Sequence, residues 1–170
     1  MNVYAITNRN IRQLTKRETR KALERFADVF KTGIPDINHG VLEVVNLNNI
    51  TLYMAGKKPV AASNNDALFP ILTVEELLKR LPSLTVDMGA VPHICDGSDV
   101  MAPGVTAIEG EFDRGSIAVV RDKNNGKAIA IARTLMKSTD MKQVKRGKVA
   151  ENLHYIGDRI WKITKAFKRT

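Results

Sequence analysis

Apolar residues recur with the period of a helix near the start of the chain. Between residues 15 and 31 they lie three or four positions apart, and basic residues occupy the opposite face. Thr15 and Glu18 have the spacing of a capping box, in which each residue bonds the backbone N–H of the other. The pattern therefore predicts a helix over residues 15–31 that ends before Gly33.

Short apolar segments follow this helix. Val41–Val45 and Ile50–Ala55 predict two strands joined by a turn, and Pro59–Ala62 predicts a third. The segment Thr73–Glu76 repeats the capping-box spacing and precedes an apolar stripe, so we predict a second helix that Pro82 ends.

The pattern changes at residue 84, where short strands alternate with glycine turns. The strongest signal is Asn124-Asn-Gly126, because a hairpin turn needs positive φ, between strands expected at Ile117–Arg121 and Lys127–Arg133. Ser138 or Thr139 can cap a short helix that extends to Val144.

Closely spaced strands with few helices indicate a small barrel. We therefore predict an α+β fold, with an N-terminal α+β domain over residues 1–83 and a small β pseudo-barrel over residues 84–170. No low-complexity tract or long linker separates the two units, so we expect them to pack against each other.

Positive charge is concentrated in two segments. The net charge is +9, and residues 9–25 carry seven Arg or Lys against two Glu. Residues 136–170 carry ten against three, whereas the rest of the chain carries ten against thirteen acidic residues. This distribution favours a phosphate-bearing partner over a general contribution to solubility.

Composition also indicates the cellular compartment in which the protein is expected. The single cysteine, Cys95, excludes an internal disulfide and suits a reducing environment. No apolar run reaches 18 residues, and the first residues lack the plan of a secretory signal. We expect a soluble, cytoplasmic protein without a membrane partner.

Catalytic and metal-binding patterns are weak. His39, His93 and His154 lie far apart, and Cys95 has no C-x-x-C partner. His93 and Cys95 would share one face of a strand as a base and a nucleophile, but packing neighbours are the favoured interpretation. No phosphate loop or dinucleotide motif occurs, so we expect a non-enzymatic protein with no cofactor and no metal.

Two motifs are more specific. The segment Gly97-Ser-Asp-Val-Met-Ala-Pro-Gly-Val105 predicts a short helical turn between two glycines. The segment His154–Trp161 predicts a hairpin closed by Gly157-Asp158, with Trp161 packed in the core from its closing strand. We expect Asp99 and Asp158 to accept turn and cap bonds from backbone N–H groups.

These motifs, with Leu84–Ala90, Asp113–Gly115, Ile131–Ser138 and Lys145–Lys148, resemble the PUA domain over roughly residues 84–163. The resemblance implies a pseudo-barrel that binds structured RNA, with the helix after the first strand facing the RNA.

The N-terminal half adds a looser resemblance. Its basic amphipathic helix, its strand pair and Phe69-Pro70 before a helix resemble archaeal relatives of the malignant-T-cell-amplified-sequence and ligatin translation factors. That family implies association with the small ribosomal subunit and tRNA, and a role in translation or ribosome recycling. Archaeosine transglycosylases carry a similar PUA unit, so a link to tRNA modification stays open.

The expected interface combines backbone N–H groups around the two glycines with nearby cations. The residues expected to contact RNA are Gly97, Ser98, Met101, Pro103, Gly104, Arg133, Lys137, Lys142, Lys145, Arg146 and Lys148. The main hypothesis is non-catalytic binding of a tRNA acceptor end or of small-subunit ribosomal RNA. The alternative is an adaptor whose N-terminal domain docks a translation factor or a tRNA-modification enzyme.

Overall fold

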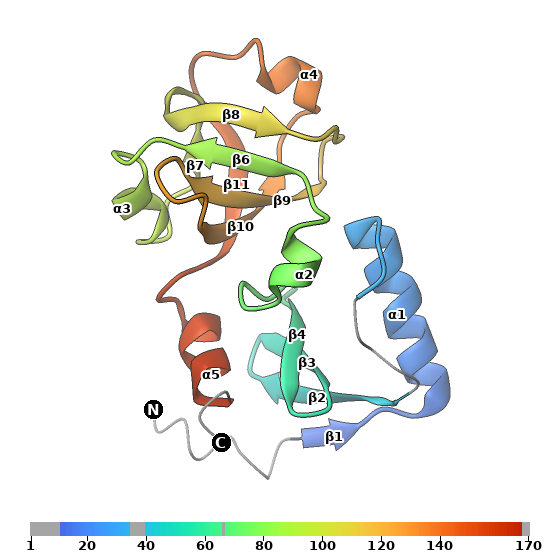
Figure 1. Ribbon diagram of the computed structural model, residues 1–170. Coiled ribbons are helices and arrows are strands. Elements are labelled where there is room, and N and C mark those ends of the chain that lie inside the picture. The colour runs from blue at the N-terminus through green and yellow to red at the C-terminus, as the bar shows by residue number, and fades with distance from the viewer. Residues whose placement is uncertain (1–10, 35–39, 66, 168–170) are drawn as a thin grey trace.

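The computed structural model describes residues 11–34, 40–65 and 67–167, in two sheets stacked along the length of the molecule (Figure 1). The first sheet is antiparallel throughout, with the strand order β1-β2-β3-β4-β5. Its strands are β1 (Ile11–Gln13), β2 (Leu42–Leu47), β3 (Ile50–Ala55), β4 (Lys58–Ser63) and β5 (Leu68–Pro70).

Helix α1 (Lys16–Phe30) confirms the helix expected near the start of the chain. Thr15 Oγ1 accepts a hydrogen bond from the Glu18 N–H at 3.2 Å, and Glu18 Oε2 accepts one from the Thr15 N–H at 2.8 Å. The buried face carries Phe26, whose ring packs edge-on against the ring of Tyr53 in β3, with 5.0 Å between the ring centroids. Local capping and a buried aromatic stripe therefore fix this helix on the first sheet.

The second helix, α2 (Glu75–Leu78), is shorter than expected, and its predicted capping box is wrong. Val74 occupies the N-cap position, and no side chain caps the helix. The chain enters α2 through a turn in which the Val74 N–H donates to the Ile71 carbonyl at 3.1 Å. Burial of Ile71 and Leu72 holds this turn, which places Thr73 outside the capping position.

The second sheet has the strand order β7-β11-β10-β9-β6-β8, and only the β6–β9 pair is parallel. Its strands are β6 (Ser83–Val86), β7 (Val100–Met101), β8 (Val105–Glu109), β9 (Ile117–Asp122), β10 (Ala128–Thr134) and β11 (Lys148–Tyr155). A 3₁₀ turn, η2 (Ala102–Gly104), alone separates β7 from β8 in the chain, yet these strands form opposite edges of the sheet. The sheet must therefore curl, which confirms the expected pseudo-barrel and the α+β class.

The hairpin expected at Asn124-Asn-Gly126 is confirmed between β9 and β10. Gly126 has φ of +64°, a conformation that favours glycine. The Asp122 carboxylate accepts hydrogen bonds from the N–H groups of Asn125 (2.7 Å) and Lys127 (3.0 Å), which closes the turn.

The glycine motif differs from its expected form. Helix α3 (Val91–Ile94) ends before Gly97, and the chain then runs extended through β7 into η2. The helical turn predicted between the two glycines is therefore confined to η2, because the pairing of β7 with β11 keeps the residues before it extended. Helix α4 (Ser138–Met141) is also shorter than expected, and its N-cap residue is Lys137.

The hairpin predicted at His154–Trp161 is wrong. β11 ends at Tyr155, and helix α5 (Arg159–Phe167) follows, so Trp161 lies on a helix and is only half-buried. The cause is the helical spacing of apolar side chains after the turn, because Ile160 and Ile163 are buried against residues of the first sheet. Asp158 caps this helix, as expected, and accepts a bond from the Trp161 N–H at 2.7 Å.

One apolar cluster joins both halves. It includes Leu77 from α2, Ile117 and Ile131 from the second sheet, and Ile163 from α5. This confirms that the two units pack against each other, whereas the domain limits 1–83 and 84–170 stay a proposal. No helix in the described ranges is long and apolar enough to span a membrane.

Candidate nucleic-acid interface

Two of the expected RNA-contacting segments meet at the β7 edge of the second sheet. Met101 of β7 pairs with Lys148 of β11, and the Ala102 N–H donates to the Gly147 carbonyl at 2.8 Å. The glycine motif therefore lies directly beside the basic segment Lys142–Lys148, although about 45 residues separate them in the chain. Met101 is 48% exposed, so this edge is open to a partner.

The sequence predicted uncovered backbone amides around Gly97 and Gly104, but the amides of Gly97 and of the next residue, Ser98, are already occupied. The Gly97 N–H donates to the Ile94 carbonyl at 3.1 Å, and the Ser98 N–H donates to the His93 carbonyl at 3.0 Å. The expectation of uncovered amides is wrong here, because these bonds end helix α3. Contact with RNA at Gly97 and Ser98 must therefore come from their carbonyl groups or from the Ser98 side chain.

Asn152 on β11 holds the glycine segment in place, and sequence reasoning did not identify it. Its side-chain amide donates to the carbonyls of Ile94 and Ser98, each at 2.9 Å. Its backbone N–H donates to Asp99 Oδ1 at 2.8 Å, so Asp99 accepts a backbone N–H as expected, but from β11 rather than within a turn. No periodic or spacing signal marks Asn152, since its partners lie more than 50 residues away in the chain.

Two of the expected cations are held in ion pairs across the sheet. Arg133 of β10 contacts Glu151 of β11 with an Nη2–Oε2 distance of 2.6 Å. Lys148 Nζ lies 2.7 Å from Asp99 Oδ2. Burial raises the pKa of Asp99, but hydrogen bonds from Lys148 and from the Asn152 N–H outweigh it and set the pKa below its ordinary value. These two cations therefore have less charge to offer a phosphate.

Four other expected cations are exposed around helix α4. Lys137 precedes this helix, Lys142 follows it, and Lys145 and Arg146 lie in the segment that leads into β11. None of the four forms an ion pair within the residues that the structure describes. They are the groups best placed to neutralise phosphates.

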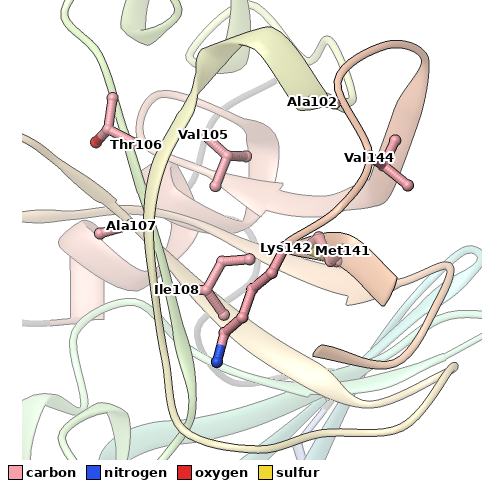
Figure 2. A pocket seen from close by; sticks show the side chains of 8 residues that line it. All are labelled: Ala102, Val105, Thr106, Ala107, Ile108, Met141, Lys142 and Val144. Carbon is pink, nitrogen blue, oxygen red and sulfur yellow. The ribbon is translucent and has the colours of Figure 1, made fainter. Parts of the chain in front are cut away.

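A pocket of about 280 Å³ lies between β8 and α4, and Lys142 is one of the residues that line it (Figure 2). Most of its lining side chains are small or apolar, and one is charged. The lining residues are Ala102, Val105, Thr106, Ala107, Ile108, Met141, Lys142 and Val144. The surface of this small pocket is more polar than apolar, and with one ammonium group at its side it suits an anion-bearing group such as part of a nucleotide.

The pocket joins residues that sequence reasoning placed at the site with others that it missed. Lys142 was expected, whereas Val105, Ile108, Met141 and Val144 were not. Each is an apolar residue that is half-buried or buried, as ordinary core residues are. The sequence therefore does not distinguish these pocket residues from core residues. Only the curl of the sheet, which brings β8 to α4, distinguishes them.

The weak catalytic candidates stay apart from this pocket. His93 is exposed on α3, and Cys95 follows that helix, so the strand alternation considered for the pair does not occur. Burial raises the pKa of the Cys95 thiol, an effect that Lys127 only partly offsets, so the reactive thiolate is disfavoured. Within the described residues, no three His, Cys, Asp or Glu side chains group as metal ligands.

Comparison with known proteins identifies this architecture. Residues 82–156 match the family model of the PUA domain. An uncharacterized protein of Methanocaldococcus jannaschii is 32% identical over 87% of this chain and 93% of its own length. Translation machinery-associated protein 20 of Saccharomyces cerevisiae is 26% identical over 89% of this chain and 87% of its own length.

A solved structure agrees over nearly the whole chain. A conserved PUA domain protein from Thermoplasma acidophilum superimposes with a TM-score of 0.69 at 31% identity, and the match covers 92% of this chain and 99% of that one. The chain therefore belongs to the family of PUA-domain proteins that includes translation machinery-associated protein 20, in the malignant-T-cell-amplified-sequence and ligatin group of translation factors.

Proposed function

We propose that this protein binds structured RNA without catalysing a reaction, and that it does so in translation. The observation that carries the proposal is a pocket between β8 and α4 that Lys142 lines, with three more exposed cations, Lys137, Lys145 and Arg146, within five residues of Lys142 in the chain. A PUA domain and a full-length relative named for the translation machinery support the same class of partner.

The RNA that fits this interface best has a free single-stranded end beside a base-paired region. An unstacked terminal base can enter the β8–α4 pocket, where polar groups can bond its edges, while Lys142 and its neighbours neutralise the phosphates next to it. A tRNA acceptor end has this form, and so do exposed ends and loops of small-subunit ribosomal RNA. We take the tRNA acceptor end as the first candidate.

The test is the affinity for tRNA, intact or trimmed of its 3′ single strand, between 50 and 200 mM salt. Trimming should weaken binding. Replacing Lys142 and Lys145 by Gln should reduce the steepness of log K against log salt by about 1.4 to 1.8, at about 0.7 to 0.9 per phosphate contact.

Exposed lysines of the first half provide a matched control, because Lys57→Gln with Lys58→Gln removes the same charge far from the pocket. This control should leave binding within about twofold of the wild type. An equal loss of tRNA affinity in both double variants would show that net charge alone causes the effect, and it would contradict the proposed site.

Docking of a protein partner is the second candidate function. A groove of about 790 Å³ in the first half, lined by residues 55–60 and 73–76 and by Phe167, favours it. If neither form of tRNA binds at 50 mM salt, the adaptor role becomes the better account of this protein.

A further inference from the structure

A stripe of cations runs along the exposed face of α1 and takes no part in the β8–α4 pocket. Arg17, Lys21 and Arg25 lie four residues apart, which places them on one side of the helix over about 12 Å. All three are exposed, and none forms an ion pair within the described part of the chain. We call these three residues the α1 stripe.

Two neighbouring cations, unlike those of the α1 stripe, form ion pairs. Arg12 contacts Glu18 with an Nη1–Oε1 distance of 3.0 Å, and Arg20 lies 3.8 Å from Glu24. Of the cations on α1 itself, Arg20 alone has an acidic partner within the described residues, and the α1 stripe has none.

This row is unfavourable for the helix itself. Like charges four residues apart repel each other, and the stripe contains two such pairs. Cations also interact unfavourably with the positive end of the helix dipole, yet Lys16 and Arg17 lie in the first turn and the last turn has no basic residue. Charges placed unfavourably for the helix are expected where the surface binds a partner.

The chemistry of the face limits what the partner can be. α1 exposes no large hydrophobic side chain, because the exposed ones in the described residues, Met88 and Met101, both lie in the second half. Protein interfaces have an apolar centre, and membrane-bound helices expose an apolar face. Glu24 and Asp28 are exposed on the same helix, but the five exposed cations of α1 outnumber these two carboxylates, so the face as a whole fits a polyanion.

We infer that the α1 stripe is a second RNA-binding surface, which contacts the base-paired body of the RNA whose single-stranded end occupies the β8–α4 pocket. This inference rests on the proposed function. In Figure 1, α1 stands beside the first sheet, and α4 lies at the far end of the second sheet. An RNA that reaches both surfaces must therefore extend along the molecule, which a short single strand cannot do.

The experiment compares two probes on the full chain: a folded tRNA and a short single-stranded oligonucleotide with the same 3′ sequence. The oligonucleotide should engage only the four cations around α4, with a slope of log K against log salt near −3, at about −0.7 per contact. The tRNA should add three contacts and give a slope of about −5 to −6.

The informative variant replaces Arg17, Lys21 and Arg25 together by Gln. Its slope for tRNA should be shallower by about 2 to 3, while its affinity for the oligonucleotide stays within about twofold of the wild type. Gln keeps a good helix propensity and the change removes like-charge repulsion, so the Tm should be unchanged or raised.

A control variant with Lys57, Lys58 and Lys123 replaced by Gln removes the same charge elsewhere on the exposed surface and should bind both probes as the wild type does. If the α1 variant keeps the wild-type slope for tRNA, the inference is overturned and the proposed function stands. Equal weakening for both probes also overturns it. If the wild-type protein binds neither probe, the proposed function itself fails.

Discussion

Gly97 and Gly104 are both required in the second half, for different reasons. Gly97 has φ of +95°, and an added Cβ would lie 3.1 Å from the Tyr155 hydroxyl oxygen. Gly104 has no such backbone constraint, but an added Cβ would lie 3.0 Å from Ala90 Cβ. Both glycines therefore permit close packing around α3 and η2, and the Gly97 amide, which the sequence suggested would be free, donates to the Ile94 carbonyl.

Asp99 and Lys148 show how single residues balance folding against binding. Their ion pair fastens the chain after Gly97 to β11, and it also lowers the charge that Lys148 can offer to RNA. Sequence alone could place both residues near the interface, but it could not show that they neutralise each other, because this depends on the pairing of β7 with β11.

The Asp99 ion pair predicts a dependence of stability on pH. The pKa of Asp99 is lowered in the folded state, so the unfolded chain takes up the proton first as the pH falls. The stabilisation is complete above the ordinary aspartate pKa of about 3.9 and is lost as the pH falls through the lower folded-state value.

Urea unfolding of the wild type and of Asp99→Asn between pH 7 and pH 3 measures this contribution. The wild type should be the more stable at pH 7, and the gap should stay constant to about pH 5 and shrink below about pH 4. A gap that does not change with pH would show that the Asp99 carboxylate does not stabilise the fold through its charge.

At the scale of elements, two short sequence motifs correctly predicted a helix cap and a hairpin turn. Thr15 and Glu18 form the predicted capping box of α1, and Asn124-Asn-Gly126 forms the predicted hairpin turn. Thr73 has the same spacing to Glu76 but caps nothing, because burial of the preceding residues sets the path of the chain. A capping motif therefore predicts the cap itself only when tertiary packing leaves the cap position free, whereas helix α2 forms without one.

The junction of β11 with α5 was misassigned because its turn suits two structures. Gly157-Asp158 can close a hairpin or begin a helix, and Asp is favoured at both positions. The helical spacing of Ile160, Ile163 and Phe167 could have resolved the choice. The same junction holds His154, fully buried, with its Nδ1 2.7 Å from Asp158 Oδ2.

Asp158 should therefore stabilise more than the first turn of α5. Asp158→Ala removes the cap on the Trp161 N–H, worth about 1 kcal/mol, and leaves a buried ring nitrogen of His154 without its partner, at about 1 to 3 kcal/mol. We expect a loss of about 2 to 4 kcal/mol in the free energy of unfolding, measured by urea denaturation.

Asp140→Ala is the matched control, since Asp140 is an exposed aspartate in the first turn of α4, and it should change stability by less than about 0.5 kcal/mol. If Asp158→Ala changes stability as little as this control does, the capping network does not hold α5 in place.

At the scale of the whole molecule, the interface depends on long-range pairing. The curl of the second sheet brings β8 to α4, and β7 pairs with β11 beside the basic segment. The sequence identified the glycine motif, the basic segment and the fold class, all of which are local or compositional. It could not identify Asn152 or the apolar lining of the pocket, because their contacts join distant parts of the chain.

The first half is bound into the same structure. Ile160 and Ile163 of α5 are buried with side chains of the first sheet, although the preceding strand belongs to the second. This return of the chain fixes the two sheets relative to each other (Figure 1). A fixed arrangement allows α1 and α4 to present cations to one extended RNA.

The most direct test of the central claim is methyl NMR of the full chain titrated with a single-stranded RNA that has the tRNA 3′ sequence. The account predicts that the methyl signals of Ile108, Met141 and Val144 shift together and saturate with the amide of Lys142. If the titration saturates while only signals of the first half shift, or if no signal shifts at low salt, RNA binding at the β8–α4 pocket is contradicted.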